Sequence, residues 1–309
     1  MSAAAQLSVH GLAAGYGGGR DRGRRSRVAA PRELVLAGVD AEVAAGDCLA
    51  VVGRSGCGKS TLLHVLAGLL APVAGTVSAA GCVVAAADWE SSGAPGCSAG
   101  HAAYMFQRDL LLPWKSALQN AVFPARLAAR SDGRAGRRRT TAGPAVAGRG
   151  AGDLDARGRA LLEEFGLGDA LDAAPAGLSG GMRQRVALAR TVLMDRGLIL
   201  LDEPLGSLDA VTRAEMRRWL LEVMAAHPAT WVLVTHDVDE AVLLGDQVAV
   251  LHGRPARLEP LPGPVLDRAA RARLAAHAAG EGEWDEAAAR ALASAAAEVR
   301  RLLHPRACV

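Results

Sequence analysis

A run of nine residues that follows a short apolar stretch has the types and spacing needed to hold phosphate. The nine residues are Gly53, Arg54, Ser55, Gly56, Cys57, Gly58, Lys59, Ser60 and Thr61. The glycines let the backbone adopt conformations that a Cβ atom would forbid, so that successive N–H groups can point at phosphate oxygens. Lys59 can reach the β- and γ-phosphates of a nucleotide, and the Ser60 hydroxyl can ligate Mg²⁺. The run predicts a nucleotide-binding loop.

A chance match in a glycine-rich chain is the alternative to this interpretation. The sequence has 36 glycines but only two lysines against 33 arginines, and one of the two lysines stands where the loop needs it. The apolar residues 48–52 before the loop have the pattern of a buried strand, and residues 62–66 after it have the pattern of a helix. This strand–loop–helix context is the one that a phosphate loop requires, and it favours nucleotide binding over coincidence.

A second apolar stretch, residues 198–201, ends in two acids. A phosphate loop needs a carboxylate at the end of a neighbouring strand to hold Mg²⁺, and Asp202 is the candidate. Glu203 points the other way and could polarise an attacking water. An acidic pair can also simply cap a strand end, but after a phosphate loop in the same chain the metal and base roles are favoured.

Two further strand ends carry polar residues. His236 closes the apolar stretch 231–235, and Gln107 closes the stretch 102–106. A lone histidine at a strand end is usually structural. However, the carboxyl ends of parallel strands lie at one edge of a sheet, where ligands bind. We therefore expect Lys59, Gln107, the Asp202–Glu203 pair and His236 to form one constellation.

The segment 178–185 predicts a second anion site. Ser179 is a good helix N-cap, and Gly180 and Gly181 follow it at the start of the expected helix. A simple helix start would not need two glycines. Because one chain cannot easily wrap both anion sites round one triphosphate, a second copy of the chain is the natural supplier.

The strands and helices expected around these residues indicate an α/β fold with a mostly parallel sheet. Half of the residues are apolar, and apolar strands alternate with helical stretches along the chain. Residues 7–12 and 34–43 alternate in hydropathy and predict an antiparallel β part near the N-terminus. A mostly helical insert occupies the middle.

The net charge and the cysteine content bear on which partners and which cellular compartment are expected. The net charge of +3 does not demand a nucleic-acid partner, and the arginine clusters at 20–27 and 134–139 are typical of solvated loops, with a phosphate or lipid-headgroup contact as the alternative. The five scattered cysteines argue against a disulfide framework or a zinc site and fit a reducing cytoplasm. Without a leader or a long apolar run, we expect a soluble protein whose membrane role comes through a partner.

Together these motifs resemble the nucleotide-binding subunit of an ATP-binding cassette (ABC) transporter, a P-loop NTPase. The resemblance covers about residues 16–252, and the LSGG sequence at 178–181 separates this family from other P-loop NTPases. It implies a head-to-tail homodimer with ATP and Mg²⁺ sandwiched between the phosphate loop of one copy and LSGG of the other. It also implies roles for single residues: Glu203 as general base, His236 at the γ-phosphate, Gln107 as a metal ligand and link to the helical subdomain, Asp209 in the loop after the acids, and Tyr16 stacked on adenine.

A finer resemblance lies in residues 107–114 and Asn120, with support from 212–220 and 235–241. These segments are similar to importers of the nitrate/sulfonate/taurine group, which includes importers of thiamine-precursor pyrimidines. Leu205 departs from the group, which usually has Phe there. The resemblance implies transmembrane permease subunits as partners, a solute-binding protein as an indirect partner, and a place at the cytoplasmic face of the membrane.

The sequence thus predicts an ABC ATPase domain over residues 1–252, with a helical subdomain at about 108–176 and a low-complexity insertion at about 131–152. Residues 253–309 are rich in Ala and Arg and predict a helical C-terminal extension. The alternative function is a soluble ABC ATPase that acts on nucleic acid or ribosomes. Only the arginine clusters favour it, and no direct nucleic-acid partner is expected.

Overall fold

The computed structural model describes residues 5–16, 33–86, 101–134, 151–206, 208–262, 266–278 and 284–303. The arginine cluster at 20–27 and most of the low-complexity insertion lie outside the described residues. None of the described helices has the length and apolar character that crossing a membrane would require.

The described strands form one sheet, in the order β5-β4-β1-β2-β10-β9-β3-β8-β7-β6. Its parallel part consists of β9 (Gln247–Gly253), β3 (Cys48–Gly53), β8 (Thr230–Thr235), β7 (Leu198–Asp202) and β6 (Ala102–Met105). Its antiparallel part consists of β1 (Ala5–Tyr16), β2 (Glu33–Ala44), β4 (Ala74–Ala79) and β5 (Cys82–Ala86). The predicted α/β fold, with its antiparallel β part near the N-terminus, is confirmed.

The parallel strands are buried on both faces, and alternate residues enter different cores. In β3, Cys48, Ala50 and Val52 pack into one hydrophobic cluster, while Leu49 and Val51 pack into the other. This period of two follows from the pleat of a strand. It explains why these segments are nearly continuous apolar runs in the sequence.

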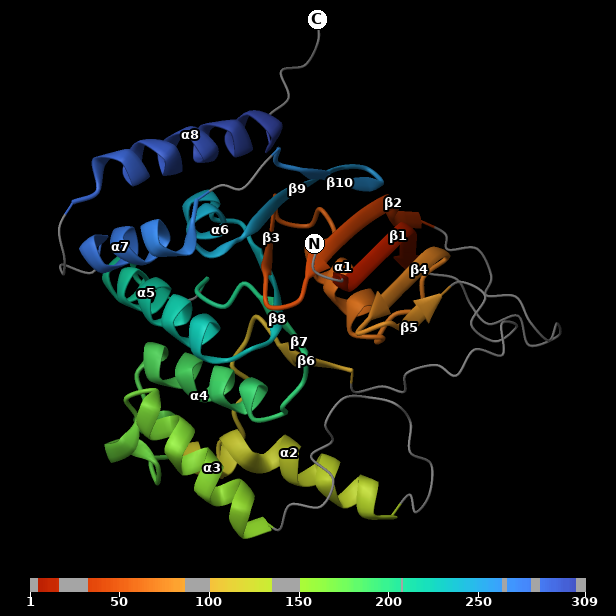
Figure 1. The fold of residues 1–309 in the computed structure, drawn as a ribbon. Helices are drawn as coiled ribbons and strands as arrows, with labels where there is room; N and C mark the ends of the chain where they lie inside the picture. Colours follow the sequence, from red (N-terminus) through yellow and green to blue (C-terminus); the bar gives the residue numbers. More distant parts are fainter. Residues whose placement is uncertain are drawn as a thin grey trace, which may run out of the picture.

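Helices cover both faces of the sheet (Figure 1). The helix α1 (Lys59–Leu66) packs in the core shared with the antiparallel strands. The helices that pack in the other core include α4 (Gly180–Val192), α5 (Ala210–Ala226), α6 (Val238–Leu244) and α8 (Glu286–Leu303), together with the two helices of the insert. The helical insert contains α2 (Ala117–Arg134) and α3 (Ala151–Glu164), so both helices extend into the ends of the predicted insertion at 131–152.

Residues 253–309, for which the sequence predicted a helical extension, also contain a strand. Residues Ala256–Pro260 form β10, which pairs antiparallel with β9 and meets β2 in parallel at Leu36. The prediction is wrong here because a short strand that contains Arg, Glu and Pro has a weak pattern of its own. The strand instead joins the parallel and antiparallel parts of the sheet.

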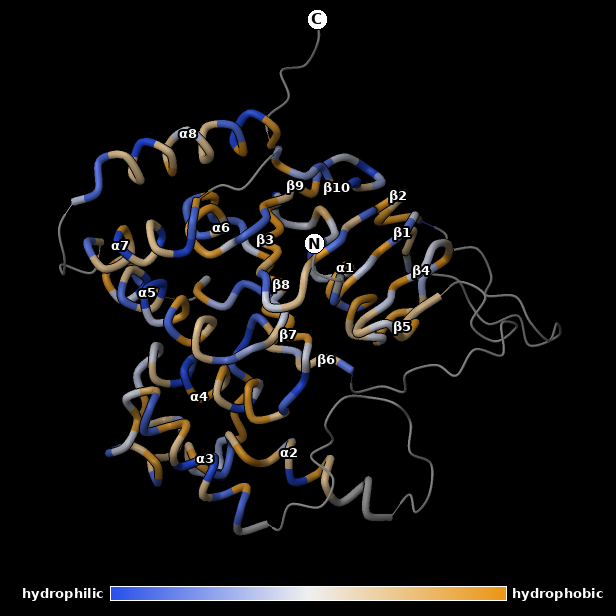
Figure 2. The backbone as a smooth tube through the Cα atoms, viewed as in Figure 1, coloured by the Kyte–Doolittle hydropathy of each residue, from blue (hydrophilic) through white to orange (hydrophobic). Residues whose placement is uncertain are grey.

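Two helices follow, as predicted: α7 (Arg268–Ala278) and α8. Hydrophilic and hydrophobic residues alternate along α8, as expected for an amphipathic helix (Figure 2). Its buried residues Ala296 and Val299 belong to the main core. The helices of the extension therefore pack on the same body as the strands.

Candidate nucleotide-binding site

The predicted phosphate loop lies between β3 and α1, at the carboxyl end of β3. Gly56 and Gly58 have positive φ angles of 76° and 109°. A Cβ atom on Gly58 would also lie 2.8 Å from Cγ1 of Val35 on β2. Both the backbone conformation and the close approach therefore require glycine at position 58.

Lys59 is almost fully buried, and its ammonium is turned back onto the loop. Its Nζ donates hydrogen bonds to the carbonyl oxygens of Gly53 at 2.9 Å and Arg54 at 3.3 Å. It also lies 3.4 Å from Oε1 of Glu203. The lysine is thus held at the mouth of the loop by one carboxylate and two backbone oxygens.

Ser60 and Asp202 face each other as the sequence predicted for a pair of magnesium ligands. The Ser60 hydroxyl donates to Oδ1 of Asp202 at 3.3 Å, and Tyr104 donates to Oδ2 at 2.9 Å. Burial and the charge of Asp202 raise the pKa of Tyr104, so its hydroxyl stays a donor. Hydroxyl and carboxylate oxygens suit Mg²⁺, which takes few protein ligands and fills its other positions with water and phosphate oxygens.

The described residues contain no group of three or more His, Cys, Asp or Glu side chains that could hold a metal ion. Sequence reasoning missed Tyr104, which lies on β6 directly opposite Leu200 of β7. The only feature of the sequence that could have indicated its role is that it is a lone tyrosine in an otherwise apolar strand.

Glu203 is the centre of the constellation. Its backbone has a φ of 47°, which is strained for a residue with a side chain, and its N–H donates to the carbonyl of Val234 at 2.9 Å. Besides Lys59, the carboxylate contacts Nε2 of Gln107 at 3.0 Å and Nδ1 of His236 at 3.3 Å. The structure therefore brings together side chains from four strand ends, as expected from parallel-sheet geometry.

His236 is followed by a buried polar brace that the sequence analysis did not identify. Thr235 donates to Oε2 of Glu240 at 2.9 Å and accepts from the N–H of Asp237 at 3.0 Å. Asp237 caps α6 and pairs with Arg217 of α5. Burial raises the pKa of Glu240 to about 7. These contacts fix the backbone on both sides of His236.

Ser179 caps α4, as predicted: its hydroxyl accepts from the N–H of Met182 at 3.2 Å. Cβ positions at Gly180 and Gly181 would lie 3.6 Å from Leu208 and 3.2 Å from Thr212. In the described part of the chain, no hydrogen bond or ion pair joins this segment to the phosphate loop of the same copy.

The helix α4 is hydrogen-bonded to the residues that follow Gln107, both near its start and in its last turn. Arg183 donates from Nε to Oδ2 of Asp109 at 3.0 Å, and Arg190 donates to the carbonyl oxygens of Asp109 at 2.6 Å and Leu110 at 3.0 Å. Burial lowers the pKa of Arg190. A movement of residues 109–110 would therefore be passed directly to the helix that begins with Gly180 and Gly181.

The remaining predicted residues lie around the loop or at the next helix. Tyr16 is half-exposed, and its hydroxyl lies 3.3 Å from Oγ1 of Thr61. Asp209 caps α5 by accepting from the N–H groups of Val211 and Thr212, each at 3.1 Å, and the bonds from Thr212 lower its pKa. Arg54, Ser55 and Cys57 line a cavity of 740 Å³ beside the loop.

The fold and this site define a P-loop nucleotide-binding domain, and the LSGG helix start points to one class within it. A protein-family model described as ABC transporter matches residues 36–206. The chain is 42% identical over 232 residues to the aliphatic sulfonates import ATP-binding protein SsuB 2 of Xanthomonas axonopodis pv. citri, which covers 74% of this chain and 67% of that protein. It is 40% identical over 255 residues to the aliphatic sulfonates import ATP-binding protein SsuB 1 of Mesorhizobium japonicum, and this alignment covers 76% of this chain and 83% of that protein. The chain belongs to the ABC transporter family.

Solved structures agree on the fold. The ATP-binding cassette MJ0796, a dimer in a post-hydrolysis state with ADP and phosphate, superposes with a TM-score of 0.60 at 23% identity, over 83% of this chain and 99% of that one. The subunit cbiO1 of the ABC transporter complex cbiONQ from Clostridium perfringens gives a TM-score of 0.60 at 22% identity, over 82% of this chain and 86% of that one. The predicted ABC ATPase fold is confirmed.

Proposed function

We propose that this chain is the ATP-hydrolysing subunit of a membrane importer for organic sulfonates. The observation that carries the proposal is the convergence of Lys59, Gln107 and His236 on the carboxylate of Glu203. A carboxylate so placed, beside a loop that binds phosphate, is suited to take a proton from a water that attacks the γ-phosphate. The names of the SsuB relatives supply the solute class.

Phosphate binding replaces contacts that the protein makes with itself. Lys59 exchanges its partners Glu203, Gly53 and Arg54 for the β- and γ-phosphate oxygens. Glu203, released from the lysine, then orients the attacking water, while His236 and Gln107 remain within reach of its other oxygen. Mg²⁺ held by Ser60 and Asp202, with Gln107 as a third ligand, would neutralise charge on the phosphate oxygens.

A second copy of the chain completes the site. Ser179, Gly180 and Gly181 form the N-terminal end of α4, which attracts anions, and among the described residues they make no hydrogen bond or ion pair with the phosphate loop of their own copy. In a head-to-tail dimer they would close over the γ-phosphate bound to the partner copy, with Asp209 nearby. Tyr16 would stack on the adenine.

The segment after Gln107 is the proposed contact with permease subunits. Leu110 and Trp114 are exposed to 52% and 75%, which is unusual for large apolar side chains so close together. The carbonyl oxygens of Asp109 and Leu110 accept hydrogen bonds from Arg190 of α4, so that movement of α4 on ATP binding reaches this surface. The chain would lie at the cytoplasmic face of the membrane and meet a solute-binding protein only indirectly.

Reconstitution tests the proposal. The subunit is combined in proteoliposomes with the permease encoded beside its gene and the matching solute-binding protein, and uptake of radiolabelled alkanesulfonate, nitrate and a thiamine-precursor pyrimidine is measured. ATP-dependent uptake of the sulfonate, lost in Glu203→Gln, is the expected result. Uptake of nitrate or the pyrimidine instead would overturn the solute class. ATPase activity stimulated by nucleic acid and not by the permease would overturn the importer.

A further inference from the structure

The short helix α6 comes directly after His236 and depends on its neighbours for its position. It has seven residues, and helices this short are not stable on their own. Five of the seven are buried, so packing and the contacts at the two ends of α6 determine where it lies. Asp237, the N-cap of α6, is the next residue after His236. A displacement of the start of α6 would therefore move the backbone that carries the histidine.

The C-terminal extension supplies part of the packing around α6. Both α7 and α8 contact this helix, and Figure 1 shows them on the same side of the molecule. Ala296 and Val299 of α8 belong to the same hydrophobic cluster as Ala241 and Val242 of α6. Leu243 of α6 packs in a smaller cluster whose other buried residues come from α7 and α8. The extension is therefore part of the environment that holds α6.

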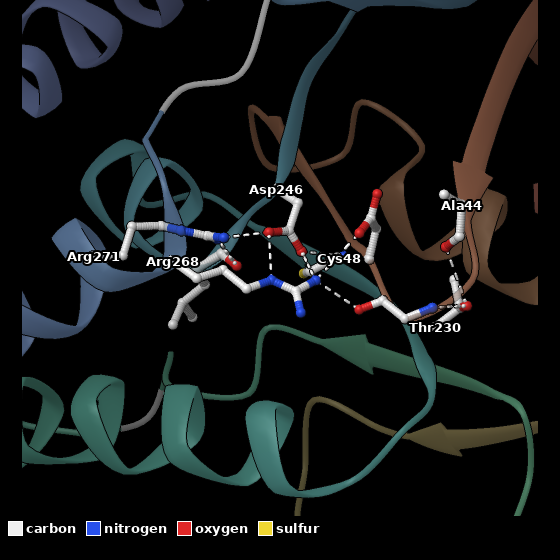
Figure 3. A network of polar contacts seen from close by, with 9 residues as sticks. Ala44, Cys48, Thr230, Asp246, Arg268 and Arg271 are labelled. Carbon is white, nitrogen blue, oxygen red and sulfur yellow. Dashed lines mark hydrogen bonds and ion pairs between the residues drawn. The ribbon is translucent and has the colours of Figure 1, made fainter. Parts of the chain in front are cut away.

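An arginine of the extension holds the C-terminal end of α6 (Figure 3). Arg271 of α7 is 1% exposed, and its Nη1 donates to the carbonyl oxygen of Leu244, the last residue of α6, at 2.8 Å. The last carbonyl oxygens of a helix have no partner within the helix, so this bond satisfies one of them. Arg271 is also ion-paired with Asp246, which accepts from Arg268 at 3.0 Å and from the N–H of Cys48 at 2.8 Å. These bonds anchor α7 to the first residue of β3.

A second arginine of the extension holds the N-terminal end of α6. Arg300 of α8 donates from Nη2 to Oδ1 of Asp239, in the first turn of α6, at 2.8 Å. The N–H of Asp239 donates in turn to Oδ1 of Asp237 at 2.9 Å. This contact is three residues from His236, whose Nδ1 lies 3.3 Å from the carboxylate of Glu203. Each end of α6 is thus attached to the extension by an arginine.

The two arginines differ in how easily their contacts can open. Arg271 is buried, so its loss would disturb the packing of the domain. The side chains of Arg300 and Asp239 are 54% and 52% exposed, and ion pairs that are so exposed contribute little to stability. The contact of Arg300 can therefore be broken while the fold is kept.

We propose that Arg300 is a positioning residue for His236. Through Asp239 and the first turn of α6 it holds the histidine at the distance from Glu203 that ATP hydrolysis requires. Release of this contact lets the start of α6 shift, and the histidine shifts with it. The extension thereby sets the rate of hydrolysis without touching the nucleotide. This inference rests on the proposed role of His236 in ATP hydrolysis.

The test compares the ATPase kinetics of full-length variants. Arg300→Gln removes the charge that pairs with Asp239 but keeps a polar side chain. Because an exposed ion pair biases an equilibrium by up to about fivefold, we expect kcat to fall about two- to fivefold. The KM for ATP and the melting temperature should stay nearly the same, whereas a merely structural role would lower the melting temperature. Arg290→Gln, which breaks the exposed pair with Glu286 within α8, is the matched control and should leave kcat unchanged.

Two further variants separate this inference from the function on which it rests. Asp239→Asn should lower kcat as Arg300→Gln does, and both changes together should lower it no further, because they remove the same pair. In the His236→Ala background, Arg300→Gln should have no additional effect. Equal kcat in Arg300→Gln and Arg290→Gln, or a full additional loss in either double variant, would overturn the inference alone. Full turnover in His236→Ala would overturn the role proposed for the histidine, and this inference with it.

Discussion

Lys59 and Glu203 form an ion pair of 3.4 Å at the edge of the sheet where the phosphate loop ends. The two side chains come from different strand–loop junctions, and both are nearly buried. The pair neutralises a lysine that would otherwise be a buried charge, which is costly. Nucleotide binding must therefore break this pair, and the two residues then act on different parts of the reaction.

The first prediction concerns the role of Glu203 as base. Glu203→Gln keeps the shape of the side chain but cannot accept a proton, so we expect ATPase turnover to fall by about 100- to 10,000-fold. ATP binding should persist, and the ATP-bound dimer should accumulate, as measured by size-exclusion chromatography with light scattering. The same change at the exposed Glu163 of α3 is the control. Normal turnover in Glu203→Gln would assign the base elsewhere.

A second prediction follows from the hydroxyl of Tyr104. Tyr104→Phe retains the ring contacts with His64 and Phe106 but leaves Oδ2 of Asp202 without its donor. Because partners that orient metal ligands typically contribute 10- to 100-fold to metal affinity, we expect the Mg²⁺ concentration for half-maximal ATPase activity to rise by about that factor. Titration of activity with Mg²⁺ at saturating ATP measures it. An unchanged midpoint would mean that Tyr104 only fills space.

The third prediction concerns the link between Arg190 and residues 109–110. Arg190→Met keeps much of the side-chain volume but removes two donors to backbone oxygens. Hydrogen exchange of peptides that cover 106–116 should accelerate about tenfold or more, since bonds from a charged group are among the stronger ones. In the same variant, the ATPase activity that the permease stimulates should fall. Arg159→Met, on the exposed face of α3, should change neither.

The fourth prediction is a pH dependence that arises from Glu240. Its pKa is raised from 4.5 to about 7 by burial and by the charge of Asp237, against Thr235, Arg217 and Arg213, which lower it. Between these two values the folded chain binds one more proton than the unfolded chain. The free energy of unfolding therefore falls as pH rises through this window, by on the order of 3 kcal/mol, and levels off above it.

Urea denaturation at about pH 5 and about pH 8 checks this dependence. Glu240→Gln is neutral at both values, so the difference between the wild type and this variant isolates the contribution of Glu240 from that of other groups. We expect the variant to lose less stability toward pH 8. An identical pH profile for both proteins would rule out the titration.

The parts of the site that sequence predicted are those in which residue type and local spacing suffice. The glycines before Lys59 and the acids that end β7 are recognisable because each follows a buried strand, and the topology then brings them together. Tyr104 was missed because its role depends on the register between β6 and β7, which spacing along the chain does not contain. Glu240 was missed because its burial against Thr235 is a tertiary property.

In the C-terminal part, too, the sequence predicted the helices but not their contacts. The helices α7 and α8 were predictable from composition, but their attachment was not. Arg268 donates to the carbonyl of Gly46 and to Asp47, which are 222 and 221 residues away from it in the sequence. The strand β10 was taken for part of a helical segment because its pairing partners, and not its own residues, stabilise it.

The scarcity of lysine in this chain has a practical consequence. Of its two lysines, Lys59 is 5% exposed and ion-paired, whereas Lys115 is half-buried beside the ring of Phe123 and adjoins the exposed Trp114. Amine-reactive cross-linkers will therefore meet one side-chain amine far more readily than the other. That amine lies next to the surface proposed to contact the permease, so the natural sequence already carries a nearly unique chemical handle for capturing its partner.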